Sequence, residues 1–289
     1  MLKILSSRKK INIVLIVIMV ILAIAFIIFA LLFHFDKKQY LIADDLYKSI
    51  RSQVVLDNPQ VSLPDEDKNQ DSEKDINTED NSKKEEVPDL KEDPFVEAKP
   101  FKIPKIDFDL LKEINPQVVA WICSEDGVID YPLVKGEDNY YYLDRLFTKE
   151  TNSSGSIFLD FRNSEDFSDK AAVIYGHNMK NGTMFAQLMK YKSQDFYEKH
   201  PRIYLITPRG DFVIELFSGF LADGKYEFIR FDFLDDLDFL DYIDSLYSLS
   251  TFTSSVKIEP NDQVMALSTC AYDFSNARFV VFGKLIPIE

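Results

Sequence analysis

The sequence predicts a mainly β domain behind an N-terminal membrane anchor. Three observations carry this prediction. Residues 13–33 contain no polar side chain. Short apolar or alternating runs, separated by turn residues, fill most of residues 127–288, as in a sandwich or a barrel. The chain also has 24 Phe and 14 Tyr, and aromatic side chains pack well on pleated sheets.

The apolar run at residues 13–33 has the length of a membrane span, since a bilayer core needs roughly 20 apolar residues as a helix. Lysine and arginine precede it at Lys3, Arg8, Lys9 and Lys10. The positive-inside rule therefore places residues 1–12 in the cytoplasm and exports the rest of the chain. A cleaved signal peptide is the alternative, but its apolar region is only about 7–15 residues long. We expect an uncleaved, single-pass anchor.

We expect residues 34–94 to be an acidic, flexible, extracellular tether, although residues 40–50 also suit a short helix. No aromatic residue occurs between residues 51 and 94. Residues 61–100 hold fourteen Asp or Glu against six Lys, which is about half of the net charge of −15. Such a segment buries too little apolar area to order itself. The acidic balance also argues against nucleic acid as a partner, because binding phosphate needs clustered Lys and Arg.

The predicted folded domain covers residues 95–289. It begins with helical spacing from Asp107 to Val118, where Asp107 or Asp109 is a candidate N-cap. Pro116 fits a turn between two short helices or the first turn of the second. Residues 233–250 predict an amphipathic helix, with Leu or Ile at 234, 237, 240, 243 and 246, that lies on the sheet. Seven apolar runs predict strands: 127–134, 155–161, 171–177, 202–208, 211–222, 263–269 and 278–288.

Only one of the three histidines lies at the end of a predicted strand. His34 adjoins the membrane span, and His200 precedes a proline in a turn, whereas His177 follows the predicted strand "AAVIYG" and opens a polar turn. Of the two cysteines, Cys123 follows Trp in an apolar run, which is typical of a core thiol. Cys270 instead ends its strand and opens a polar loop. A disulfide between the two is the alternative outside the cell.

Cys270 and Arg278 lie at facing strand ends if residues 264–270 and 278–285 pair as antiparallel strands. A thiolate is a nucleophile, and a nearby cation favours it. Arginine stays charged, so it cannot take the thiol proton, but it can donate to an oxyanion. His177 is the candidate for the proton transfer. A Cys–His–Arg trio suits acyl transfer; the alternative is a cysteine that fills space beside a strand-end arginine.

The motif "LSTC", with Arg eight positions after the cysteine and "YGHN" upstream, resembles the sortases, cell-wall transpeptidases of Gram-positive bacteria. "NPQVVAWI", "YPLVKGEDNYYYL", "GSIFLDFRN" and "VIYGHNMKNGTMF" resemble class B sortases in particular. The similarity covers nearly all of residues 107–289. It implies a closed eight-stranded sortase barrel with N-terminal helices and an extra helix between the sixth and seventh strands.

The resemblance also implies roles. Cys270 is expected as the nucleophile, His177 as the general acid and base, and Arg278 as the group that holds the substrate carbonyl. Expected partners are exported proteins that carry a C-terminal sorting motif and an amine of a peptidoglycan precursor (lipid II), with no metal or other cofactor. Candidate substrate contacts lie beside the nucleophile and in the segment before the amphipathic helix: Ser268, Thr269, Tyr226, Phe228 and Ile229.

Other functions share some of these features. A thiol protease would use the same cysteine and histidine but release its product to water. Asp93-Pro94-Phe95 matches the lid tripeptide of pilin-polymerising class C sortases, although three residues in an acidic tether match easily by chance. An anchored binding module would leave Cys270 inert. A zinc site is disfavoured, because His177 and Cys270 supply two ligands and zinc takes at least three from protein.

Overall fold

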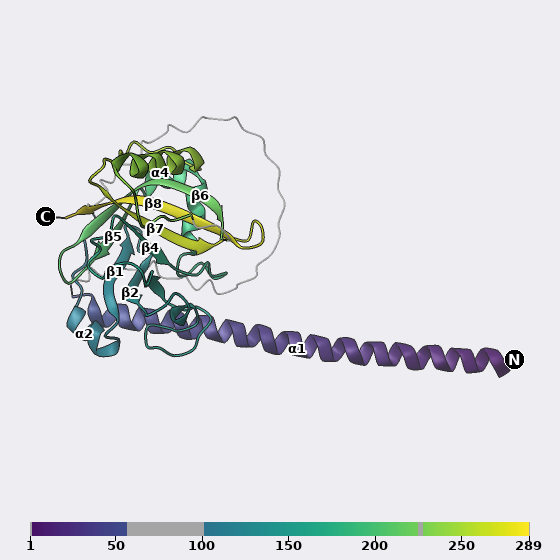
Figure 1. The fold of residues 1–289 in the computed structure, drawn as a ribbon. Helices are drawn as coiled ribbons and strands as arrows, with labels where there is room; N and C mark the ends of the chain where they lie inside the picture. Colours follow the sequence, from purple (N-terminus) through teal and green to yellow (C-terminus); the bar gives the residue numbers. More distant parts are fainter. Residues whose placement is uncertain (1, 57–100, 225–227, 289) are drawn as a thin grey trace, which may run out of the picture.

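A computed structural model describes residues 2–224 and 228–288 apart from residues 57–100. Eight strands close into a barrel in the order β1-β2-β3-β4-β7-β8-β6-β5 (Figure 1). This confirms the predicted eight-stranded barrel. The strands are β1 (Val118–Ser124), β2 (Asp130–Lys135), β3 (Ile157–Leu159), β4 (Ala171–Tyr175), β5 (Arg202–Ile206), β6 (Phe212–Asp223), β7 (Gln263–Cys270) and β8 (Ala277–Pro287).

Among the described residues, five helical elements follow α1 (Leu2–Val54): the first precedes β1, and the other four lie in connections between strands. They are α2 (Phe108–Ile114), η1 (Tyr141–Leu143), η2 (Ala186–Lys192), α3 (Gln194–Lys199) and α4 (Asp236–Leu249). Asp107 caps α2 by accepting a hydrogen bond from the amide of Leu110, at one of the two expected cap positions. The second short helix expected after Pro116 is wrong, because residues 118–124 form β1. That segment is rich in Val, Trp and Ile, which favour a buried strand.

Two apolar cores lie on the two faces of the barrel wall. One joins the barrel to the last turns of α1 and to α2, and the other lies between the sheet and α4. The buried face of α4 is Phe239, Tyr242, Ile243 and Leu246, a spacing of 3, 1 and 3 residues that follows one helical face. The expected leucine stripe is wrong at its start: Leu234 precedes the helix, and Leu234 and Leu237 are 92% and 72% exposed.

The long N-terminal helix α1 (Leu2–Val54) runs outward from the side of the barrel opposite α4 (Figure 1). By length and composition, it is apolar enough to cross a membrane. Its last turns pack into the barrel core through Ala43, Tyr47, Ile50 and Val54, all at most 6% exposed.

This packing corrects the expected tether boundary. The stretch up to residue 54 is helical, and Val55 continues into a bridge with Ile106. Apolar residues at 43, 47, 50 and 54 recur at helical spacing, so this part of the chain has a face to bury. The acidic residues 57–100, including the Asp93-Pro94-Phe95 tripeptide, lie outside the described residues.

Candidate active site

Three strand ends meet at one end of the barrel. β7 and β8 are antiparallel, and Cys270 lies opposite Arg278 in their register, as the sequence predicts. β4 runs parallel to β7, with Tyr175 opposite Ser268. Parallel neighbours end at the same edge, so the residues that follow β4 lie beside the end of β7.

The turn after β4 is hydrogen-bonded to β7. The amide of Gly176 donates to the carbonyl of Ser268 over 3.1 Å, and the Thr269 hydroxyl donates to the carbonyl of Gly176 over 2.8 Å. Two residues after Gly176, the Asn178 side chain donates to the carbonyl of Cys270 over 2.9 Å. These bonds lie on either side of His177 and hold it next to Cys270.

The imidazole of His177 is oriented by a backbone carbonyl. Its Nε2 lies 2.6 Å from the oxygen of Leu143 in η1. A carbonyl only accepts, so Nε2 carries the proton in this bond and Nδ1 remains for the thiol. The backbone at Gly155 lies close to both Leu143 and His177, and its φ is +58°. A Cβ at this position would lie 2.6 Å from the Leu143 oxygen and 3.1 Å from the ring of His177. Glycine is therefore needed at position 155.

The thiol and the imidazole shift each other's pKa in complementary directions. The hydrogen bond from His177 lowers the pKa of Cys270 against the opposing effect of burial, and the charge of Arg278 lowers it further. The same bond to Cys270 raises the pKa of His177, against desolvation, and the bond to Leu143 adds to the rise. Both directions favour the thiolate–imidazolium form, which is the form that reacts with a carbonyl.

Arg278 is a half-buried cation that lines a cleft together with Cys270 and His177. Its Nη1 donates to the carbonyl of Ala277 over 3.1 Å. Across the described ranges, no carboxylate lies within ion-pair distance of its guanidinium. Arg278 therefore has donors left for a ligand.

The cleft around Cys270 is a cavity of about 210 Å³. Ser268 and Thr269, two of the candidate substrate contacts, line it. The Thr269 hydroxyl is already bonded to Gly176, whereas the hydroxyl of Ser268, 1% exposed, has no hydrogen-bond partner among the described residues. The full lining is Asn139, Tyr140, Leu143, Phe158, Tyr175, Gly176, His177, Ser268, Thr269, Cys270 and Arg278.

Phe228 and Ile229, two of the expected substrate contacts, are not among the residues that line this cleft. Phe228 packs against the outer core, where its carbonyl accepts from Tyr242, and Ile229 is 3% exposed in the same core. Both are held there by contact with α4, and Tyr226 lies outside the described residues.

Sequence reasoning missed the opposite wall of the cleft, from Asn139 to Leu143. One signal was available: three consecutive tyrosines, Tyr140 to Tyr142, in a predicted loop. Of these, Tyr142 is fully buried, while Tyr140 is 77% exposed beside the cleft. In the part of the chain that the structure describes, no three His, Cys, Asp or Glu side chains are grouped like metal ligands.

Comparison with known proteins decides the family. The sortase domain family matches residues 127–286. The sortase B of Listeria monocytogenes is 38% identical over 178 residues, which cover 61% of this chain and 72% of that protein. This chain belongs to the sortase family. It resembles class B sortases throughout the barrel, and sortases are cysteine transpeptidases, so the chain is an enzyme of this kind.

Solved structures support the same assignment for this sortase. Clostridium perfringens sortase B matches with a TM-score of 0.59 and 38% identity, covering 62% of this chain and 100% of that one. Staphylococcus aureus sortase B matches with a TM-score of 0.60 and 35% identity, covering 63% of this chain and 87% of that one. Similar structures of the Staphylococcus aureus protein include a substrate complex, and another similar sortase B structure is a complex with triglycine.

Proposed function

We propose that this sortase is a membrane-anchored transpeptidase that cleaves a sorting motif near the C-terminus of exported proteins and transfers them to an amine of a peptidoglycan precursor. One observation carries the proposal. Cys270, His177 and Arg278 line one cleft, where Cys270 lies opposite Arg278, a cation without a carboxylate partner among the described residues. A nucleophile, a proton carrier and a donor for an oxyanion are the groups that acyl transfer needs.

In the first half-reaction, the Cys270 thiolate attacks a backbone carbonyl carbon of the motif, and a carbon–sulfur bond forms. Arg278 donates to the carbonyl oxygen while it carries negative charge. The carbon–nitrogen bond then breaks, and the proton on His177 passes to the leaving amine. The N-terminal part of the substrate remains on the enzyme as a thioester, and His177 is neutral.

In the second half-reaction, an amine attacks the thioester carbonyl. His177 takes one proton from this amine, a new amide bond forms, and the Cys270 thiolate leaves. The cycle therefore ends with the thiolate and imidazolium that began it. The sortase B relative in complex with triglycine supports an amine acceptor for this class of enzyme. For the present chain, the peptidoglycan precursor is the proposed acceptor.

We further propose that α1 spans the membrane with its N-terminus in the cytoplasm and the barrel outside. The apolar part of α1 is long enough to cross a bilayer, and lysine and arginine precede it. N-terminal sequencing of protein extracted from membranes is expected to find the start near residue 1. A mature start beyond residue 33 would contradict an uncleaved anchor.

The test of the activity uses the full chain in detergent, a library of quenched fluorescent peptides, and oligoglycine or a diamine as the acceptor. We expect cleavage, an enzyme adduct of the acyl mass on Cys270, and a transfer product. Cleavage with release only to water would favour a thiol protease. A folded protein that forms no adduct and whose Cys270 resists alkylation at neutral pH would favour a binding module.

A further inference from the structure

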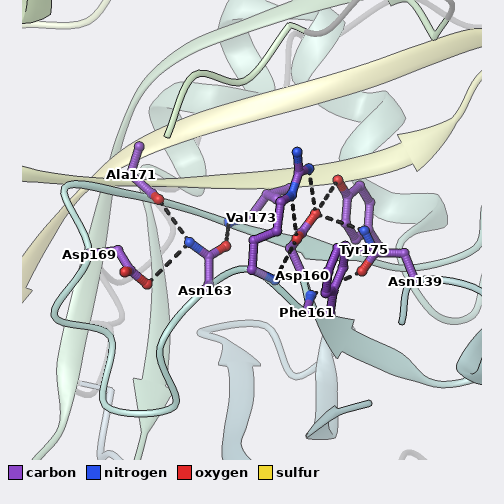
Figure 2. A network of polar contacts seen from close by, with 9 residues as sticks. Asn139, Asp160, Phe161, Asn163, Asp169, Ala171, Val173 and Tyr175 are labelled. Atoms are coloured by element: carbon purple, nitrogen blue, oxygen red, sulfur yellow. Dashed lines mark hydrogen bonds and ion pairs between the residues drawn. The ribbon is translucent and has the colours of Figure 1, made fainter. Parts of the chain in front are cut away.

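A buried carboxylate lies directly behind the cleft. Asp160 follows β3 and has no exposed surface. Arg162 donates to it three times, from its amide, Nε and Nη2, each over 2.9 Å. Asn139 donates from Nδ2 over 2.8 Å, and the Tyr175 hydroxyl donates over 3.1 Å (Figure 2). The proposed reaction uses none of these bonds.

Asp160 joins parts of the chain that form different sides of the cleft. Asn139 belongs to the wall before η1, and Tyr175 is the last residue of β4, on the side of His177; both line the cavity. Arg162 extends the network to the segment before α4, because its guanidinium lies 4.0 Å from the ring centre of Phe231. A single carboxylate therefore holds side chains from elements that are far apart in the sequence.

The charge of Asp160 also fixes which way its partners point. Burial raises the pKa of Asp160, but the hydrogen bonds from Arg162 and Asn139 outweigh it, so the pKa lies below its ordinary value and the group is ionised at neutral pH. An ionised carboxylate only accepts. Tyr175 must therefore direct its proton at Asp160. Asn139 must direct its NH2 group there, and its Oδ1 accepts the amide of Phe161 over 3.1 Å.

We propose that Asp160 is a positioning residue, which holds Asn139 and Tyr175 in the orientation that receives the acyl part of the substrate. This inference rests on the proposed function, because it assigns the cleft beside Cys270 to that part of the substrate. Asp160 lines no part of the cavity itself. Its effect is expected in substrate binding and in the choice of peptide, not in the reactivity of the thiol.

The test substitutes Asp160→Asn in the full chain in detergent. An amide of nearly the same shape places a donor against the donors of Arg162 and Tyr175. Hydrogen bonds to charged groups are worth enough to change binding about 10-fold or more. With a quenched peptide selected by turnover with the unsubstituted chain, we expect KM to rise about 10-fold or more while kcat changes by less than about 3-fold. The rate of Cys270 alkylation by iodoacetamide should stay within about 2-fold.

Asp130→Asn is the matched control. Asp130 is a largely buried carboxylate too, bonded to Arg51 and to the indole of Trp121, but it is absent from the cleft lining. A general effect of losing a buried carboxylate would raise KM in both variants. A specific effect raises it only in Asp160→Asn. An unchanged KM for Asp160→Asn, or equal changes in the two variants, would overturn the inference.

Two further measurements keep the test decisive. In a Tyr175→Phe background, Asp160→Asn should add little to KM, because coupled residues are non-additive. If Asp160→Asn does not fold, Arg162→Met removes the side-chain bonds that steady Asp160, from a position that is 40% exposed. KM should rise here too, and an unchanged KM counts against the inference.

Equilibrium binding separates this inference from the proposed function. The same peptide, labelled with a fluorophore, is titrated against Cys270→Ala with and without Asp160→Asn. Tight binding to Cys270→Ala that weakens with Asp160→Asn supports the positioning role, even for a peptide that the unsubstituted chain does not cleave. Binding that is equal in the two proteins contradicts the positioning role alone, whatever the turnover.

Discussion

Cys123 in β1 and Cys270 in β7 both lie near an arginine, yet their thiols are in opposite electrostatic situations. Cys123 is 3% exposed, and burial, followed by the charge of Asp130, raises its pKa well above the ordinary value. The nearby Arg51 lowers it too little, because this arginine is paired with Asp130. Cys270 faces a cleft, and hydrogen bonding from His177 lowers its pKa.

The difference shows that an arginine near a cysteine is not enough to activate it. At Cys123, the positive charge is compensated by a carboxylate that is itself bonded to Trp121. At Cys270, hydrogen bonding from an imidazole lowers the pKa of the thiol, and Arg278 forms no ion pair with a carboxylate among the described residues. The two thiols differ in pKa because a third group lies near each: the carboxylate of Asp130 near Cys123, and the imidazole of His177 near Cys270.

Replacing each cysteine by alanine is expected to give the largest difference in turnover and alkylation between two variants. Cys270→Ala removes the nucleophile and should abolish thioester formation and alkylation at neutral pH together. Cys123→Ala should leave both within about 2-fold, since a buried thiol with a raised pKa is inert. Mass spectrometry of the alkylated protein and peptide turnover measure the two outcomes. Labelling of Cys123 at a similar rate in folded protein would break the comparison.

His177→Ala removes the group that distinguishes the reactive site. Turnover should fall by about 10²–10⁴-fold, as is typical for general acid–base groups. The folded pKa of Cys270 is lowered mainly by this hydrogen bond, so thiolate is present below the pH at which an ordinary thiol ionises. In the variant, the alkylation rate should therefore reach half its maximum at a higher pH. An unchanged pH profile would show that His177 does not bond to the thiol.

Arg278→Lys keeps the charge but loses the planar fork of donors. If Arg278 binds the oxyanion, kcat should fall by about 10²–10³-fold, with a smaller change in KM. Peptide cleavage and transfer by the purified variant measure the loss, and circular dichroism checks the fold. Near-normal turnover in a folded variant would make Arg278 a strand-end cation, comparable to Arg51 near Cys123.

The smallest expected effect on chemistry, though not on stability, comes from removing α1. A chain that begins at Phe101 loses the buried side chains of Tyr47, Ile50 and Val54 and the ion pair of Arg51. Each large apolar side chain contributes about 1.5–3 kcal/mol on burial, so the melting temperature should fall by about 5 °C or more. Alkylation of Cys270 in the folded fraction should persist. An equal melting temperature would mean that the barrel does not depend on α1.

Local patterns predicted the parts of the site that local geometry determines. A strand, a short loop and a strand place Cys270 opposite Arg278, and the end of an apolar run exposes His177. The wall from Asn139 to Leu143 was not predictable in this way, because its position depends on a parallel pairing between β2 and β3 across a long connection. No local pattern indicates which loop side chains reach a distant strand end.

Errors in the predicted elements have similar causes. Val118 fits helical spacing, but the strand preference of its neighbours and pairing with β2 and β5 prevail. Leu234 and Leu237 continue the apolar pattern in the sequence, but their side chains are exposed and do not pack on the sheet. The helix considered at residues 40–50 is present, but the acidic composition that follows it hid the apolar face by which it packs on the barrel.

The continuous α1 has a mechanical consequence. A random-coil connection between the anchor and the barrel would limit only the distance of the barrel from the anchor. Within that distance, the cleft would adopt every orientation. A continuous helix whose last turns pack against the barrel also fixes the orientation of the barrel relative to the helix axis. Tyr47 of this helix donates to the carbonyl of Gly155, the residue that lies against both Leu143 and the ring of His177. The direction of α1 therefore sets the direction in which this loop and the cleft beside it face.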